Sequence, residues 1–231
     1  MFSWLLSGAL AEEAAETAAQ AEPTWFENAV KKLVETPLTV WIAILVLAAL
    51  GVILLVVTRT SRKWNAQMLS FAALSIALSF VLSCIRLYRM PQGGSVTPAS
   101  MLPLMLFSAA FGVGPGLLAG LVYGILQYLQ GGWFLNVWQF ALDYLLAFAA
   151  LGLAGLAKKL PEKWGLYVAM VIAAVGRALS ATLAGIMFWD TAPWASLVYN
   201  GTYLIPEVVI CIVLAVIIAK PVMRIMKAGT R

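Results

Sequence analysis

The sequence predicts an all-α integral membrane protein, and two observations carry that prediction. Hydrophobic residues occupy 63% of the 231 positions and charged residues 11%, and the mean hydropathy is +0.94. An ordinary soluble domain carries about 25% charged residues, so this chain has too few charges to cover a water-facing surface. Its apolar residues also fall into long runs without any charge, which are typical of helices that cross a bilayer.

The charge-free runs predict seven membrane-spanning helices, because one span needs about 20 mostly apolar residues. The first run ends at Arg59, and the second lies between Lys63 and Arg86. The uncharged stretch 90–142 is too long for one span and is divided at the helix breakers of 112–116. The predicted spans are 38–57, 68–87, 101–112, 115–131, 137–157, 165–189 and 196–219.

This division also predicts how the chain is organised. A six-helix membrane domain covers 66–220, an additional transmembrane helix with a basic cytoplasmic linker precedes it at 38–65, and a basic cytoplasmic tail follows at 221–231. Residues 1–37, rich in Ala and Glu, are expected to form an exposed extracytoplasmic segment. The first residues resemble the core of a signal peptide but lack a basic region before it, so cleavage is an open alternative.

The basic residues predict the orientation. Ten of the fifteen Lys and Arg residues lie in three segments, 59–63, 158–163 and 220–231, which the helix count puts on one side. Because cytoplasmic loops are enriched in Lys and Arg, we expect the N-terminus outside and the C-terminus in the cytoplasm of a prokaryotic plasma membrane. The net charge of +5 then reflects orientation in the lipid bilayer and does not point to nucleic acid.

Several classes of chemistry lack the residues they need. The chain has no His, and its two Cys, Cys84 and Cys211, are far apart, which argues against zinc sites, Ser-His-Asp triads and a disulfide framework. It also shows no Gly-rich phosphate loop and no nucleophile–base pair. We therefore expect no enzymatic activity, no catalytic residue, no metal and no cofactor.

Asp143, Arg177 and Glu207 are ionisable residues inside predicted spans, where charges are costly and usually functional. Each carboxylate shares a helix face with polar residues at helical spacing. One such stripe is Asn136, Gln139 and Asp143, and a second is Asn200, Tyr203 and Glu207. A third stripe, on another helix, consists of Tyr123, Gln127 and Gln130. Three stripes predict a shared polar cavity, which two carboxylates against one Arg would make net negative. The alternative for Arg177 is a structural ion pair with one carboxylate.

Aromatic residues gather toward the same ends of these helices, among them Trp133, Tyr144, Trp189 and Tyr203. The simplest interpretation of Trp133 is the aromatic belt at a membrane interface. Tyr144 and Tyr203 lie beside or on polar stripes and are expected to face a ligand. A net negative cavity with aromatic walls suits a flat organic cation, which carboxylate pairing and cation–π contact would hold.

Two small-residue motifs predict close packing. Gly116, Gly120 and Gly124 form GxxxGxxxG, a pattern that lets a neighbouring helix approach the backbone. Ala73 and Ala77 form AxxxA, and this smooth face could pack inside the bundle or against another protein.

Four strings, MPQGGSVTPASMLPLMLF, GLLAGLVYGILQYLQGG, QFALDYLLAFAALGLAGL and SLVYNGTYLIPE, carry a resemblance to a known family. Over about 66–220 the chain resembles the thiamine-binding S component of energy-coupling factor (ECF) transporters, the ThiT family. The resemblance implies a six-helix S-component bundle that captures thiamine from outside and hydrolyses nothing. It also implies partners: a transmembrane coupling protein and two ATPase subunits, which drive release of the substrate inside. Residues 1–65 lie outside the resemblance.

The resemblance also implies a binding site. By position, Asp143 would face the cationic ligand, while Tyr144 and Trp189 would stack on its rings. Asn200 would hydrogen-bond the pyrimidine edge. With the residues expected from the polar stripes and the aromatic cluster, the substrate-binding set is Asp143, Tyr144, Trp189, Asn200, Tyr203, Glu207, Gln139 and Trp133.

Further expectations concern the partners and the choice of ligand. Ala73 and Ala77 match the family motif that docks the coupling protein, and loop 89–100 would act as a lid. Ala181 and Ala195 stand where well-known members have His and Tyr, which leaves thiamine, its phosphates and its pyrimidine precursor open as ligands. An S component for another vitamin is a second alternative, and a membrane scaffold without a transport role is an alternative of a different class.

Overall fold

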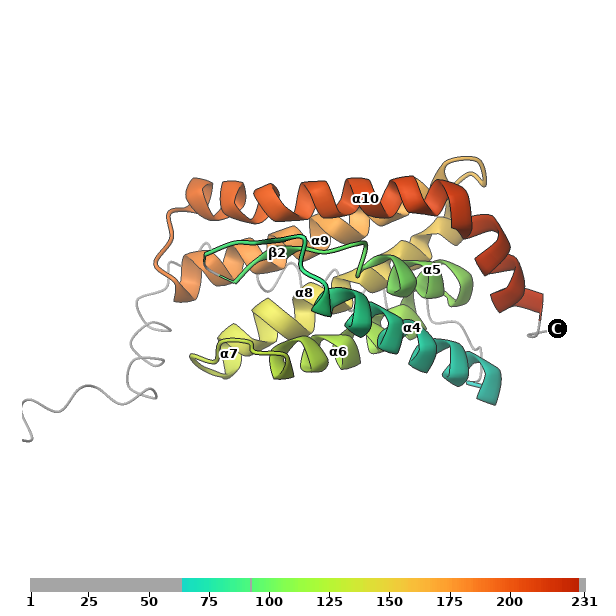
Figure 1. Ribbon diagram of the computed structural model, residues 1–231, viewed down its shortest axis with the longest axis horizontal. Coiled ribbons are helices and arrows are strands. Elements are labelled where there is room, and N and C mark those ends of the chain that lie inside the picture. The colour runs from blue at the N-terminus through green and yellow to red at the C-terminus, as the bar shows by residue number, and fades with distance from the viewer. Residues whose placement is uncertain (1–63, 92, 229–231) are drawn as a thin grey trace, which may run out of the picture. The chain divides into compact units, whose positions relative to one another are not determined.

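A computed structural model describes residues 64–91 and 93–228, and these residues are mostly helical (Figure 1). The predictions for 1–37 and for the additional helix at 38–57 lie outside the described residues. The helices are α4 (Ala66–Cys84), α5 (Leu102–Phe111), α6 (Val113–Leu129), one helical stretch made of α7 (Val137–Phe140), η1 (Ala141–Leu146), α8 (Ala147–Ala149) and η2 (Ala150–Lys159), then α9 (Gly165–Phe188) and α10 (Pro193–Ala228). Two short strands, β1 (Tyr88–Arg89) and β2 (Ser95–Val96), lie between α4 and α5.

Four of the described helical stretches are long and apolar enough to cross a membrane: α4, the stretch from α7 to η2, α9, and α10. Helix α5 has ten residues and is therefore about 15 Å long, half of the roughly 30 Å hydrocarbon core. All ten residues are buried, so protein surrounds α5 along its whole length and shields its terminal backbone groups from lipid. The chain is a multi-pass membrane protein with a short helix in its core.

Helix α5 forms the centre of that core. It packs against α4, α6, η2 and α10. Its aromatic residues Phe107 and Phe111 stack with ring centroids 4.9 Å apart, and both side chains are fully buried. The helix ends at Gly112, whose φ of 111° lies in the region that favours glycine.

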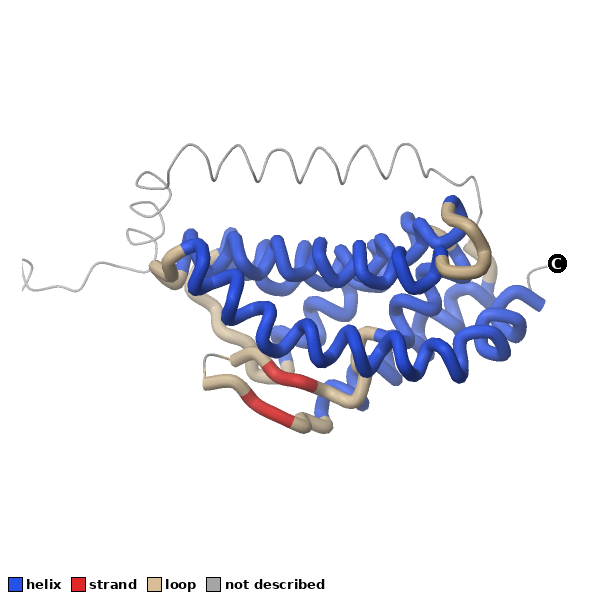
Figure 2. Tube along the Cα trace, turned by 90° about the horizontal axis from the view of Figure 1, so that it is seen from above, coloured by secondary structure: helices blue, strands red, loops and turns tan. Residues whose placement is uncertain are grey.

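The segment after α4 differs from the prediction of a helix to 87 followed by a loop. Helix α4 ends at Cys84, and β1 pairs with β2 in antiparallel register, Tyr88 opposite Val96 and Arg89 opposite Ser95. The β1–β2 hairpin lies beside α10 (Figure 2). Gly93 has a φ of 104° and allows the chain to reverse between the strands. A two-residue strand is too short to give a periodic pattern, so hydrophobicity alone extended the predicted helix.

The last helix also differs, because α10 continues to Ala228 and not to 219. The first part of the predicted tail 221–231 is therefore helical. Lys220 ends the apolar run, but a helix can continue after it leaves the hydrocarbon. Pro206 and Pro221 lie inside α10 without ending it, although each lacks a backbone N–H to donate.

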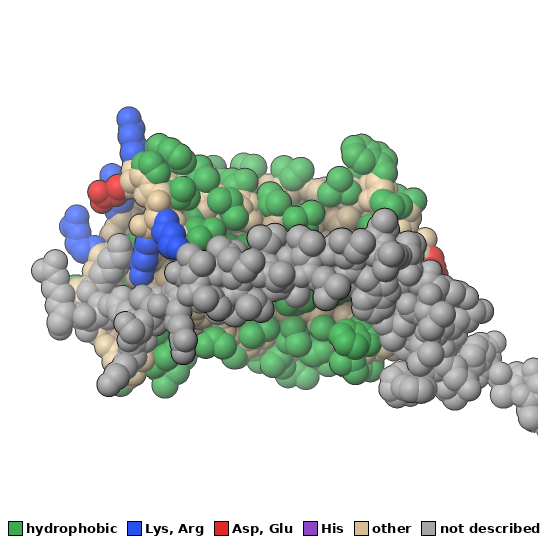
Figure 3. All heavy atoms as spheres, turned by 180° about the vertical axis from the view of Figure 1, so that it is seen from behind, with side chains coloured by type: hydrophobic (Ala, Val, Ile, Leu, Met, Phe, Trp, Pro, Cys, Tyr) green, Lys and Arg blue, Asp and Glu red, His purple; other side chains and the backbone are tan. Residues whose placement is uncertain are grey.

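Charge is unevenly distributed over the surface. On the face shown in Figure 3, Lys and Arg side chains gather at one end of the described helices, and hydrophobic side chains are prominent along the visible length of these helices. This is the separation that a membrane-spanning bundle requires. The orientation of the two termini stays a prediction.

The GxxxGxxxG prediction of close helix packing is confirmed. A Cβ atom on Gly120 would overlap the carbonyl oxygen of Phe148, and one on Gly124 would overlap the carbonyl oxygen of Tyr144. The contact is reciprocal, since a Cβ on Gly152 would overlap the backbone of Leu117. Helix α6 and the stretch from η1 to η2 thus pack backbone against backbone.

This contact predicts that Gly120→Ala destabilises the protein. The added methyl group has no room, and overpacking of this kind costs about 1–3 kcal/mol. Gly114→Ala is the matched control, because a Cβ there meets nothing within 4 Å. Thermal unfolding in detergent should show a clearly lower midpoint for Gly120→Ala alone; equal midpoints for the two variants would contradict the packing.

Candidate functional site

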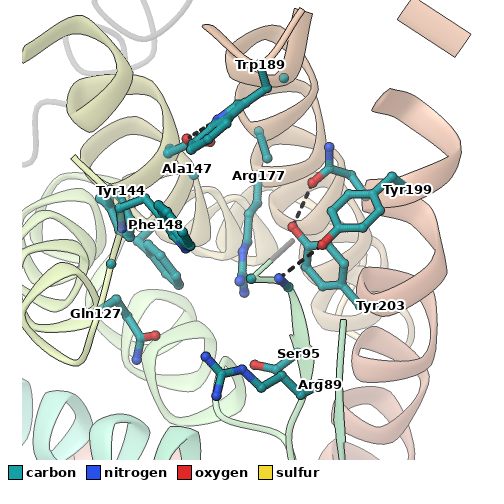
Figure 4. A pocket seen from close by; sticks show the side chains of 18 of the residues that line it. Arg89, Ser95, Gln127, Tyr144, Ala147, Phe148, Arg177, Trp189, Tyr199 and Tyr203 are labelled. Carbon is teal, nitrogen blue, oxygen red and sulfur yellow. Dashed lines mark hydrogen bonds between the residues drawn. The ribbon is translucent and has the colours of Figure 1, made fainter. Parts of the chain in front are cut away.

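A cavity of about 460 Å³ opens between α6, the η1–α8 turn, α9, α10 and the β1–β2 hairpin (Figure 4). Its volume is in the range of small-molecule sites, roughly 300–1,000 Å³. Six of the predicted substrate-binding residues line it: Trp133, Asp143, Tyr144, Trp189, Asn200 and Tyr203. The structure therefore brings together residues from three helices and a loop that the sequence assigned to one site.

Asp143 lies on a π-helical turn, η1, where the sequence predicted a regular helix. Such turns are rare and often occur at functional sites. The Asp143 Oδ2 atom accepts hydrogen bonds from Gln139 Nε2 at 2.7 Å and from Trp189 Nε1 at 3.3 Å. These two donors fix the carboxylate against the cavity wall.

Gln139 supports this arrangement without lining the cavity. Its side chain is fully buried, and its Oε1 accepts a hydrogen bond from the Leu135 backbone N–H at 3.2 Å. The side chain of Asn136 caps α7 by accepting from the Gln139 backbone N–H at 2.8 Å. Gln139 is thus held from two sides and donates to Asp143, and its predicted contact with substrate stays a prediction.

Three aromatic residues lie near Asp143. Trp133 and Trp189 meet edge to face with centroids 6.2 Å apart, and the Tyr144 hydroxyl accepts a hydrogen bond from the Trp133 backbone N–H at 2.9 Å. The Tyr144 ring packs edge-on against Tyr128. Trp133 and Trp189 are 63% and 41% exposed, so part of each side chain is open to the surroundings of the cavity.

The opposite wall is formed by α10. The Tyr203 hydroxyl donates to Asn200 Oδ1 at 2.7 Å, and Asn200 Nδ2 donates to the Ser196 carbonyl at 2.9 Å. Tyr199 lines the cavity beside Tyr203 and accepts a hydrogen bond from the Gly94 backbone N–H at 3.3 Å. A Cβ on Gly94 would overlap the Tyr203 ring, so only glycine lets the hairpin lie this close to the site.

The predicted net negative charge of the cavity is wrong. Arg86, Arg89 and Arg177 line it together with a single carboxylate, Asp143. The predicted ion pair of Arg177 is also absent from the described residues. Its guanidinium carbon instead lies 4.4 Å from the ring centroid of Phe148. The sequence argument failed because it left out Arg86, at the end of the predicted span 68–87, and Arg89, which follows that span.

Glu207 is not among the residues that line the cavity. Its side chain is 1% exposed, and its Oε1 accepts hydrogen bonds from Thr97 Oγ1 at 2.6 Å and Ser100 Oγ at 2.7 Å. The carboxylate therefore joins α10 to the segment between β2 and α5. Helical spacing put Glu207 on the face of Asn200 and Tyr203, but spacing cannot tell how deep along the helix the cavity reaches.

The predicted substrate-binding set leaves out several residues of the cavity wall: Arg86, Arg89, Ser95, Gln127, Phe148, Arg177 and Tyr199. Gln127 carried a signal, because it lies on the polar stripe of Tyr123, whose hydroxyl accepts its amide N–H at 2.8 Å. Tyr199 precedes Tyr203 by one helical turn and could have been found by that spacing. The hairpin residues carried no periodic signal.

A family model described as thiamine transporter protein matches residues 69–227. The chain belongs to this family. The thiamine transporter ThiT of Bacillus subtilis (strain 168) is 33% identical over 158 residues, covering 60% of this chain and 82% of that protein. A solved structure of ThiT from Listeria monocytogenes shares the fold with a TM-score of 0.59 and 24% identity, covering 69% of this chain and 96% of that one.

Helix α4 presents a second surface. Its buried residues are Met68, Ala72 and a serine row, Ser75, Ser79 and Ser83. Ala73 and Ala77 face outward and are exposed. The AxxxA motif therefore does not pack inside the described part of the bundle.

The bonding of Glu207 predicts a structural role that two substitutions separate. Glu207→Leu leaves the buried hydroxyls of Thr97 and Ser100 without their acceptor, and an unpaired buried group costs about 1–3 kcal/mol. Glu207→Gln keeps a carbonyl oxygen that can accept both. Thermal unfolding should rank Glu207→Leu well below Glu207→Gln; equally lowered midpoints would mean that the charge itself is required.

Proposed function

We propose that this protein is the substrate-capture S component of an ECF-type importer, which binds thiamine from outside and delivers it inward. The observation that carries the proposal is the position of Asp143, fixed by hydrogen bonds beside the indole rings of a ligand-sized cavity. Thiamine is an organic cation with two planar aromatic rings, and a fixed carboxylate next to aromatic faces is the chemistry that holds such a ligand. The names of the related proteins support the same substrate.

Each wall has a role in this proposal. The Asp143 carboxylate pairs with the positive charge or the amino group of thiamine, and Trp189 and Tyr144 stack against its rings. The amide of Asn200 has one N–H beyond its bond to Ser196, and this donor is available to a ring nitrogen. Gln139 keeps Asp143 oriented, so that the site is preformed and loses little conformational entropy on binding.

The hairpin and α4 provide the two moving contacts that import needs. The β1–β2 hairpin covers the cavity from the side of Tyr199 and Tyr203 and acts as a lid. Ala73 and Ala77 on the exposed face of α4 form the docking surface for the transmembrane coupling protein, which two ATPase subunits drive. With the N-terminus outside, the hairpin and the cavity mouth face the exterior.

Thiamine titration tests the capture step. Purified protein in detergent should bind thiamine with 1:1 stoichiometry in a calorimeter, and Asp143→Asn should weaken binding at least tenfold because a charge-assisted contact is lost. Glu162→Gln is the matched control, since it removes the same charge from an exposed position outside the cavity. No heat and no thermal shift with thiamine would refute the proposal.

A second ligand is favoured by one observation: Ala181 lines the cavity and leaves space where well-known members carry a larger side chain. A precursor of thiamine or another vitamin could use that space. The same assay with a panel of vitamins and the pyrimidine precursor discriminates, because the true ligand should bind most tightly.

Coupling can be tested separately from capture. Ala77→Trp should abolish co-purification with the coupling protein and ATPases while leaving thiamine affinity within about twofold, because Ala77 lies away from the cavity. Val216→Trp is the control, since Val216 is exposed on α10 outside the proposed surface. Thiamine binding without recovery of any coupling module by wild-type protein would favour a scaffold without transport.

A further inference from the structure

The arginines of the cavity have no counterpart in the proposed recognition of a cation. Arg86, Arg89 and Arg177 line the same cavity as Asp143, so the wall carries more positive than negative charge. Among the described residues, none of the three forms an ion pair. A site built only for a cation would be weakened by this excess, since like charges repel over the few ångströms of a ligand site.

Arg177 is the most informative of the three. It comes from the middle of α9 and stacks on Phe148 through one face of its guanidinium. Its Nη1 atom is buried and has no hydrogen-bond partner among the described residues. A guanidinium carries five N–H donors, and a buried donor without an acceptor is unfavourable. Nη1 is therefore available to an acceptor that a ligand brings into the cavity.

The charges are separated within the cavity. Figure 4 shows Trp189, which bonds Asp143, on one side of the open space, with Arg89, Ser95 and Gln127 on the other. The side chains of Arg177 and Arg89 point into this space from α9 and from β1 (Figure 4). The cavity therefore has a carboxylate end and a guanidinium end.

We propose that the guanidinium end, formed by Arg89 and Arg177, binds the phosphate group of a phosphorylated thiamine, so that thiamine phosphate esters bind more tightly than thiamine. Guanidinium groups match phosphate oxygens in geometry and charge, often through paired hydrogen bonds. Ser95 and Gln127 add neutral donors beside them. The inference rests on the proposed function, because it needs the organic cation to occupy the Asp143 end of the cavity.

The ratio of two affinities tests the proposal. In lipid-free detergent, wild-type protein should bind thiamine monophosphate at least tenfold more tightly than thiamine. Arg89→Gln should reduce this preference to less than about threefold. Arg224→Gln, an exposed position near the end of α10, is the control and should keep the full preference.

Each result has a distinct meaning. Equal or weaker binding of the monophosphate by wild-type protein would overturn the phosphate subsite and leave the thiamine proposal intact. Binding of neither compound would overturn the proposed function itself. Arg177→Lys, which keeps the charge but loses the paired geometry, should weaken the monophosphate more than thiamine; equal weakening of both would assign Arg177 a structural role and remove it from the subsite.

A lipid headgroup carries the same phosphate chemistry, so a separate experiment distinguishes it from a soluble ligand. Adding phosphatidylglycerol to the detergent should leave monophosphate affinity unchanged if the subsite serves a soluble ligand. Competition by the lipid would overturn the proposal and show that the arginines hold a membrane phosphate.

Discussion

Backbone contact between α6 and the helical stretch from η1 to η2 is the constraint on which the rest of the site depends. Glycines on both sides permit it, because a Cβ at Gly120, Gly124 or Gly152 would overlap backbone atoms of the other helix. The contact at Gly124 is with the carbonyl of Tyr144, inside the π-helical turn that also carries Asp143. The glycines of α6 and the π turn of its partner therefore act together. The glycines let the two helices pack closely, and the π turn directs Asp143 and Tyr144 into the cavity beside them.

The position of the β1–β2 hairpin also depends on a glycine that allows close packing. Gly94 lies against the ring of Tyr203 and donates to the Tyr199 hydroxyl, so the hairpin rests directly on the wall of the site. Behind it, Glu207 bonds Thr97 and Ser100 and ties the chain after β2 to α10. A buried carboxylate that accepts hydrogen bonds from two hydroxyl groups holds this segment in place. The hairpin itself, with exposed Tyr88 and Arg89, has few contacts that resist movement.

The sequence predicted the helical membrane architecture and several of the residues that line the cavity, because both leave periodic patterns of apolar and polar residues. Charge-free runs mark spans, and polar residues at helical spacing brought Asp143, Asn200 and Tyr203 together correctly. Periodicity could not predict how far along a helix the cavity reaches, or which side chains on a shared face contact the cavity directly. Glu207 continues the stripe of Asn200 but lies beyond the cavity, and Gln139 shares the face of Asp143 but supports it from behind. The π turn depends on tertiary packing, and Arg86 and Arg89 lie next to and within a strand pair too short to be recognised.

The charge distribution links recognition to movement. Asp143 lies on a helix that backbone packing holds in place, whereas Arg89 lies on the hairpin. A ligand with a positive ring at one end and a negative group at the other would contact a fixed wall and a movable lid at the same time. Its affinity for the closed arrangement would exceed that for the open one by the strength of the Arg89 contact, and only such a difference can shift a conformational equilibrium. A purely cationic ligand gains nothing from Arg89, so it must close the lid through aromatic contacts alone.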